Sequence, residues 1–146
     1  MRKVFRAEYP ILFSHCDPAG IAYFPRLFDL LHQTMEAWFS DGLDERYADF
    51  VMKKRIGAPT VSMQCDFLSP AFFGDRLSIE LSVVRIGNSA IDFAYDARVG
   101  TRACFKARHS VCTLCLETFK SIPIPDALRQ RMQAYLADEA PEPLQQ

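Results

Sequence analysis

The stretch FPRLFDLLHQTMEAWFSDG, residues 24–42, decides the fold. Its apolar residues recur every three or four positions, which predicts an amphipathic helix of about 17 residues with a wide apolar stripe. Pro25 stands in the first turn, where no N–H donor is needed, and Gly42 is expected to end the helix as a left-handed cap. Such a stripe requires a sheet to cover it. The stripe comprises Phe24, Leu27, Phe28, Leu31, Met35, Trp38 and Phe39.

Strand patterns lie on both sides of this helix. An imperfect alternation predicts a first strand at residues 3–14, and a short helix is expected at 44–53. Four further strands are predicted at Thr60–Phe67, Arg76–Ile86, Ala90–Val99 and 102–116. Because short turns containing glycine join the last three, they predict an antiparallel meander. One apolar helix against a five-stranded antiparallel sheet is an α+β architecture.

The C-terminal part is predicted to hold one more helix and a tail. Asp126 is expected to cap this helix. Its apolar positions are Leu128, Met132, Tyr135 and Leu136. Residues 138–146 are acidic and contain proline, so they are expected to be a disordered tail behind a single domain of residues 1–137.

Composition narrows the function classes. The chain has 146 residues, 49% hydrophobic and 24% charged, which is typical of one globular domain. Its 17 Lys and Arg balance 18 Asp and Glu, so a nucleic acid is not expected as a partner. The longest run without a charged residue has ten residues, too few to span a membrane. Five cysteines and no recognisable export signal favour reduced thiols and a cytoplasmic protein.

Aromatic residues are the unusual feature of the composition. There are 12 Phe, 5 Tyr and 1 Trp, which make up 12% of the chain. Such a content suits a bulky core, a hydrophobic ligand pocket or an aromatic subunit interface. The residues alone leave these three uses open.

The polar segment HCDPAGIAYFP, residues 15–25, leads from the first strand into the long helix. A helix N-terminus offers unpaired N–H groups and a partial positive charge, which can stabilise an oxyanion. Asp17 lies a few residues earlier, and a carboxylate there can attack an acyl carbon or activate water. Gly20 would let the backbone approach a substrate. Taken alone, an aspartate before a proline is more often a turn opener or a helix cap.

This segment resembles the active-site loop of the 4-hydroxybenzoyl-CoA thioesterase family, which has the hot-dog fold. The shared pattern is an Asp-Pro-Ala-Gly-Ile start, a few bulky residues, a proline and an aromatic-rich helix. The resemblance covers about residues 5–136. Weaker matches follow in the same order: DFLSP at 66–70, FGD at 73–75, VRIGNS at 84–89 and IPIP at 122–125.

The resemblance implies an acyl-CoA thioesterase, a hydrolase that releases a free acid and CoA. It implies Asp17 as nucleophile or general base and the backbone N–H of Phe24 as the group that polarises the carbonyl. It also implies a homodimer with one continuous sheet, paired again into a homotetramer, with acyl-CoA at the subunit interface and no metal or cofactor. A non-catalytic module that binds acyl-CoA or acyl-carrier protein on the same fold is the alternative.

Two polar residues near the loop and the helix have open roles. His15 could orient the carboxylate of Asp17, but a single loop histidine is more often a surface or packing residue. Some related enzymes place a carboxylate inside the long helix, and Glu36 is the candidate here. The helical phase of Glu36 favours solvent exposure instead.

Substrate contacts are expected from several further positions. Arg85, Lys106 and Arg108 could hold the CoA phosphates, and parity places the last two on one strand face. A solvated sheet face explains these charges equally well. Ser89 could bond a ligand or only close its turn. The expected aromatic neighbours of the acyl group are Tyr23, Phe24, Phe28, Trp38 and Phe67.

Metal and redox sites are not expected. Cys112 and Cys115 have CxxC spacing, but residues three apart in one strand point to opposite faces. A second CxxC pair is missing from the sequence. The three histidines, His15, His32 and His109, lack a metal-binding spacing.

Overall fold

A long helix and a curved antiparallel sheet make up most of the computed structural model, which describes residues 3–137. The strands are β1 Phe5–Pro10, β2 Ile56–Gly57, β3 Thr60–Phe67, β4 Arg76–Ile86, β5 Ala90–Val99, β6 Arg102–Cys112 and β7 Leu114–Cys115. The helices are α1 Phe24–Ala37, α2 Tyr47–Met52 and α3 Asp126–Gln133, with a 3-10 turn at Phe13–His15 and a π-helical turn at Trp38–Gly42.

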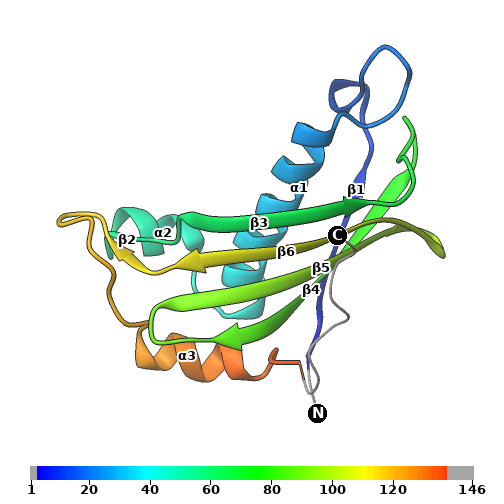
Figure 1. Ribbon diagram of the computed structural model, residues 1–146. Helices are drawn as coiled ribbons and strands as arrows, with labels where there is room; N and C mark the ends of the chain where they lie inside the picture. The colour runs from blue at the N-terminus through cyan, green and yellow to red at the C-terminus, as the bar shows by residue number, and fades with distance from the viewer. Residues whose placement is uncertain (1–2, 138–146) are drawn as a thin grey trace.

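The sheet has five strands in the order β1-β4-β5-β6-β3, and α1 crosses one of its faces (Figure 1). Each neighbouring pair is antiparallel, so the predicted meander and the α+β architecture are confirmed. Strand β3 pairs with β6 and ends the sheet on that side. Strands β2 and β7 form a separate small sheet.

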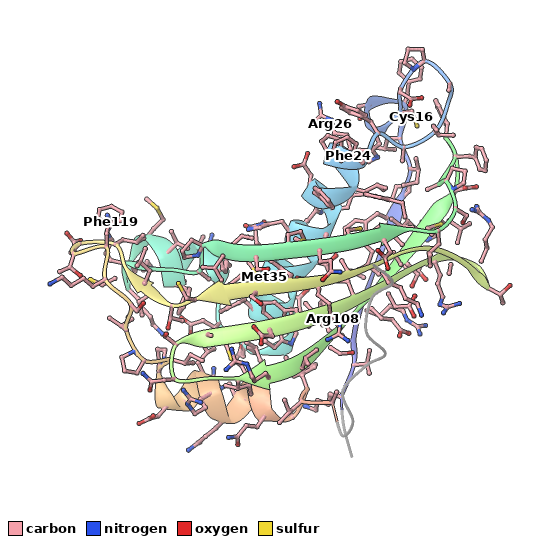
Figure 2. The ribbon with its side chains drawn as sticks, in the orientation of Figure 1. Cys16, Phe24, Arg26, Met35, Arg108 and Phe119 are labelled. Carbon is pink, nitrogen blue, oxygen red and sulfur yellow. The ribbon has the colours of Figure 1, made fainter. Side chains whose placement is uncertain are left out.

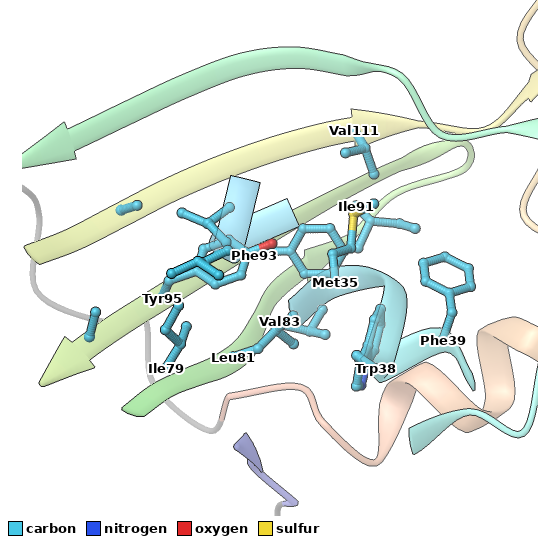
Figure 3. Packing of buried hydrophobic residues seen from close by; sticks show 14 of the residues in the cluster. Met35, Trp38, Phe39, Ile79, Leu81, Val83, Ile91, Phe93, Tyr95 and Val111 are labelled. Atoms are coloured by element: carbon cyan, nitrogen blue, oxygen red, sulfur yellow. The ribbon is translucent and has the colours of Figure 1, made fainter. Parts of the chain in front are cut away.

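The core lies between α1 and the sheet. Along β4, Leu77, Ile79, Leu81 and Val83 are 0% exposed, as a period of two predicts for a sheet with one covered face. Burying one such side chain contributes roughly 1.5–3 kcal/mol. Met35 packs against the same face, among side chains from β4, β5 and β6 (Figure 3).

The end of the long helix corrects the role expected for Gly42. Trp38–Gly42 continue the helix with a wider turn, in which the N–H of Leu43 donates to the carbonyl of Trp38 at 2.9 Å. The residue with positive φ is Asp44, at 52°, so Gly42 is not the left-handed cap. The glycine serves close packing instead, because a Cβ there would lie 2.7 Å from Cδ1 of Trp38.

The first strand is shorter than predicted, because it ends at Pro10 and a 3-10 turn follows at Phe13–His15. The N–H of Leu12 donates to Nδ1 of His15 at 2.9 Å instead of to a neighbouring strand. This contact closes the 3-10 turn at Phe13–His15. Ile11 nevertheless stays in the core at 1% exposure.

The last predicted strand breaks at Thr113. Its N–H donates to the carbonyl of Ser89 at 2.8 Å, and its hydroxyl donates to the carbonyl of Ile122. The chain therefore leaves the main sheet and forms β7. Cys112 and Cys115 lie in two different strands, so the expectation of one strand holding both was wrong.

The C-terminal helix differs from the prediction at both ends. Pro125 is the N-cap and Asp126 is the first helical residue. The helix ends before Tyr135 and Leu136, of which Tyr135 is buried and Leu136 is 37% exposed. The N–H of Val83 donates to the carbonyl of Tyr135 at 3.2 Å, which holds this segment to β4.

Two expectations concern other parts of the chain. The tail predicted at 138–146 lies outside the described residues. Within residues 3–137, none of the helices combines the length and apolar character needed to cross a bilayer.

Candidate active site

The loop that carries Asp17 is a small hairpin held against the segment before β4. Cys16 and Ala22 form an antiparallel bridge across it, and the N–H of Asp17 donates to the carbonyl of Ile21 at 3.0 Å. The N–H of Ala22 donates to the carbonyl of Ala71 at 2.8 Å. These bonds fix the loop immediately before the start of α1.

Asp17 makes the turn that its Asp-Pro sequence predicts and still offers a free carboxylate oxygen. Its Oδ1 accepts a bond from the N–H of Ala19 at 2.9 Å, and its carbonyl accepts one from Gly20 at 3.0 Å. Gly20 has φ of 78°, a conformation that glycine adopts without strain. Within residues 3–137, no hydrogen bond involves Oδ2 of Asp17. The turn reading and a catalytic role are therefore compatible.

The first turn of α1 leaves one backbone N–H without an acceptor among the described residues. Pro25 has no N–H, while those of Arg26 and Leu27 both donate to the carbonyl of Tyr23, at 2.8 and 3.4 Å. No side chain caps the helix. Among the residues that the structure describes, the N–H of Phe24 has no acceptor. A free donor at the positive end of a helix can stabilise an oxyanion.

The loop and this helix start lie together. The N–H of Tyr23 donates to the carbonyl of His15 at 2.8 Å, which joins the two ends of the hairpin. Figure 2 shows Cys16 in the loop close to Phe24 and Arg26 at the start of α1. The structure thus brings together the two parts that the sequence analysis paired.

His15 has a structural partner of its own. Its Nδ1 accepts the bond from Leu12 that closes the 3-10 turn, and no bond to Asp17 is present. Glu36 is half-exposed and lies 3.4 Å from His32 on the same helix. The side chains of both residues therefore have partners other than Asp17.

An aromatic cluster borders the helix start. The rings of Phe24 and Phe28 are 6.0 Å apart, and the ring of Phe67 lies 6.2 and 6.1 Å from them. Tyr23 adds a contact of 5.4 Å with Phe24. Tyr23, Phe24 and Phe67 are half-exposed, so the cluster is open to a ligand or a second subunit.

Trp38 does not belong to this cluster, so its expected place beside the acyl group was wrong. It is 0% exposed and packs against Phe39, Phe93 and Tyr135 at ring distances of 5.3 to 5.6 Å. It lies at the opposite end of α1 from Phe24. The helical spacing alone did not show which stripe residues end in the core.

A groove of about 390 Å³ runs between α1 and β3. It is lined by Phe28, Asp29, Leu31, His32, Thr60, Met63 and His109. Neither His109 nor Thr60 was predicted as a site residue from the sequence. Parity contains the missing signal, because residue 109 lies on the same face of β6 as the buried residues 107 and 111.

The basic residues expected near CoA lie elsewhere on the protomer. Lys106 and Arg108 share the sheet face opposite α1, as parity predicted, and Figure 2 shows Arg108 there. Arg85 pairs with Asp92 at 2.7 Å, and Ser110 donates to the same carboxylate. Hydrogen bonds from these two residues hold the pKa of Asp92 below its ordinary value despite the opposing effect of burial.

The turn with Ser89 is also distant from Asp17 within one chain. The hairpin of Asp17 is held against Ala71, shortly before β4 begins, whereas Arg85 stands at the far end of β4. The ten residues from Asp75 to Arg85 span roughly 30 Å along an extended strand. The carbonyl of Ser89 accepts the N–H of Thr113. Arg129, which the sequence did not single out, donates to the carbonyls of Gly87 and Asn88 at 2.8 and 2.9 Å.

Metal binding receives no support from residues 3–137. Within that range, no group of three or more His, Cys, Asp or Glu side chains is arranged to hold an ion. The five cysteines are free thiols.

Known proteins resemble this chain along most of its length. The thioesterase-like superfamily model matches residues 11–132. A 1,4-dihydroxy-2-naphthoyl-CoA hydrolase from Synechococcus elongatus is 30% identical over 131 residues, covering 88% of this chain and 95% of that protein. One from Nostoc punctiforme is 28% identical, covering 92% of this chain and 90% of that protein.

Solved structures share the fold. A thioesterase superfamily protein from Jannaschia sp. superimposes with a TM-score of 0.85 at 26% identity, covering 92% of this chain and 94% of that one. A 1,4-dihydroxy-2-naphthoyl-CoA thioesterase from Synechocystis gives a TM-score of 0.82 at 21% identity, covering 90% and 96%.

The broader part of the resemblance seen in the sequence is confirmed, since the fold and the superfamily match. The curated relatives are named for a naphthoyl-CoA substrate rather than for 4-hydroxybenzoyl-CoA. The chain belongs to the thioesterase-like superfamily, and it is a thioester hydrolase with the hot-dog fold.

Proposed function

We propose that this acyl-CoA thioesterase acts on an aromatic acyl-CoA, with Asp17 and the N–H of Phe24 as its catalytic groups. The observation that carries the proposal is the unpaired Phe24 amide at the start of α1, joined through Tyr23 and His15 to the hairpin of Asp17. A carboxylate beside an oxyanion donor is what acyl transfer requires.

The reaction follows from these two groups. The N–H of Phe24 donates to the thioester carbonyl oxygen and stabilises the charge that develops there. The Asp17 carboxylate then either attacks the carbonyl carbon, forming an anhydride and releasing the CoA thiolate, or takes a proton from a water that attacks instead. In the first route water hydrolyses the anhydride and restores Asp17. Neither route involves a metal or an organic cofactor, so dialysis against a chelator is expected to leave activity unchanged.

An aromatic acyl group is favoured by two observations. The rings of Phe24, Phe28 and Phe67 cluster at the helix start and are partly exposed. Offset and edge-to-face contacts stabilise aromatic pairs by about 0.5–1.5 kcal/mol beyond burial. The curated relatives carry the name of a bicyclic aromatic acyl-CoA.

A homodimer is favoured by the free edge of β3. This strand pairs with β6 on one side, and Val61 on it is 61% exposed. A long exposed edge strand is a template for pairing with another chain. Pairing β3 with its copy would extend the sheet across two subunits and cover the aromatic cluster.

Pairing two dimers would bring the other predicted substrate-binding residues to the CoA site. Arg85 and Ser89 lie at the far end of β4 from the hairpin of Asp17, and Lys106 and Arg108 lie on the sheet face away from α1, so we expect them to reach CoA at a neighbouring subunit. We therefore place the phosphates of CoA at an interface within a homotetramer.

The test is Asp17→Asn, assayed by CoA release from aliphatic and aromatic acyl-CoAs. We expect a loss of at least about 100-fold in kcat with the fold unchanged. Asp41→Asn, an exposed aspartate at the far end of α1, is the matched control. Wild-type turnover by Asp17→Asn would rule out its role, and tight binding without hydrolysis by the wild type would favour the non-catalytic binding module.

A further inference from the structure

A buried polar chain ends in the groove between α1 and β3. The phenol oxygen of Tyr95 lies 3.1 Å from Nδ1 of His109, and Nε2 of His109 lies 2.8 Å from Oγ1 of Thr60. Tyr95 and His109 are 2% and 1% exposed, whereas Thr60 is exposed and lines the groove. The mechanism proposed above uses none of the three.

Burial determines the direction of these hydrogen bonds. Within residues 3–137, the Tyr95 hydroxyl has no other partner, and burial keeps it protonated by raising its pKa well above the usual value. A buried hydroxyl without an acceptor is unfavourable, so Tyr95 donates to Nδ1 of His109. Burial also lowers the pKa of His109 to about 4, which keeps the ring neutral with its proton on Nε2.

These bond directions determine what the hydroxyl of Thr60 can donate to. Because Nε2 of His109 donates to Oγ1 of Thr60, the hydroxyl proton of Thr60 is left for an acceptor in the groove. The walls beside it include the apolar side chains of Phe28, Leu31 and Met63, and Asp29 and His32 of α1 also line the groove. At about 390 Å³ the groove falls within the roughly 300–1,000 Å³ of typical small-molecule sites.

We infer that Thr60, oriented by His109 and Tyr95, recognises a ring hydroxyl on the aromatic acyl group. The inference rests on the proposed function, since it assigns the acyl pocket of the same enzyme. The apolar side chains suit a flat ring, and the oriented Thr60 donor suits an oxygen on that ring, a contact that an unsubstituted ring cannot make.

The proposed dimer connects this groove with the catalytic loop. Phe67, at one end of β3, contacts Phe24 at the start of α1, whereas Thr60 stands at the other end of the strand. A two-fold axis at the middle of β3 places Thr60 of one protomer opposite Phe67 of its partner. The acyl ring then extends from the catalytic loop of one protomer into the groove of the other.

The experiment compares two matched ester pairs, 1,4-dihydroxy-2-naphthoyl-CoA with 2-naphthoyl-CoA and 4-hydroxybenzoyl-CoA with benzoyl-CoA. Thr60→Val is expected to lower kcat/KM for the preferred hydroxylated ester roughly tenfold, mostly through KM, and to leave its unsubstituted partner unchanged. Thr60→Ser keeps the donor and should retain the preference. An irregularity in the strand register between Thr60 and Ser62 places Ser62 on the opposite face of β3. Ser62→Ala, which removes a hydroxyl from that face, is therefore the matched control.

Tyr95→Phe provides a second variant, because it removes the donor that holds the His109 tautomer. Its preference for the hydroxylated ester should fall while the rate with the unsubstituted ester is kept. Equal losses on both esters, in either Thr60→Val or Tyr95→Phe, would overturn the inference.

A binding measurement separates this inference from the proposed function. With three histidines in the chain, ¹⁵N NMR can follow His109 during titration with 1,4-dihydroxy-2-naphthoate and 2-naphthoate. Only the hydroxylated acid should shift the Nε2 signal, and Thr60→Val should abolish the shift. Failure of the wild type to hydrolyse any ester would refute the proposed function, whereas identical shifts with both acids would refute the role of Thr60.

Discussion

The buried imidazole of His109 makes the stability of the protein depend on pH. It is 1% exposed, and burial lowers its pKa from 6.5 to about 4, because the charged ring loses its hydration. The unfolded chain binds a proton near pH 6.5, but the folded chain does so only near pH 4. Since the unfolded state then holds more protons, stability falls as pH falls through this window.

The size of the effect follows from the two pKa values. At 1.36 kcal/mol per pKa unit, lowering the pH from 7 to 4.5 should cost about 2.5 kcal/mol from this residue alone. Stability from the neutral ring is fully present above pH 6.5 and is lost progressively below it. This is a large share of the 5–15 kcal/mol typical of a domain.

The assay is urea unfolding of wild type and His109→Gln at pH 7 and pH 4.5, at one fixed protein concentration. The variant removes the ionisable group, so its loss of stability between the two pH values should be about 2.5 kcal/mol smaller. The pKa of Asp92 is also lowered, which makes both proteins less stable in acid, but this contribution cancels in the comparison. An identical pH dependence in the two proteins would refute the reasoning.

Three further changes probe the fold and the interface. Met35→Ala should destabilise the protein by about 2–5 kcal/mol in urea unfolding, because Met35 is fully buried. Met52 is 68% exposed, so Met52→Ala should change stability little. Similar losses in the two variants would contradict the assigned core. Gly42→Ala should cost about 1–3 kcal/mol, because its Cβ would lie 2.7 Å from Trp38, and an unchanged melting temperature would argue against that contact. Val61→Lys places a charge on the free edge of β3 and should shift the protein towards monomers in light scattering, so a fully retained dimer would count against pairing through β3.

The sequence predicted those features that depend on neighbours along the chain. The apolar stripe of α1 and the alternation in β4 follow from periods of three to four and of two, and both agree with the burial observed. Asp17 and the helix start could be paired because only a few residues separate them. Gly42 shows the limit of this reasoning, since its closest contact is the side chain of Trp38, which no local pattern reveals.

Periodicity and the loop motif therefore determined the fold class, the long helix and the position of the candidate site. The tertiary structure decided what lies in the groove, because Thr60, Tyr95 and His109 meet only through the pairing of β3, β5 and β6. It also decided that Trp38 is core and that Arg85 lies at the far end of the sheet from Asp17. The physical reason is that local conformation depends on adjacent residues, whereas burial and hydrogen bonding depend on which distant segments pack together.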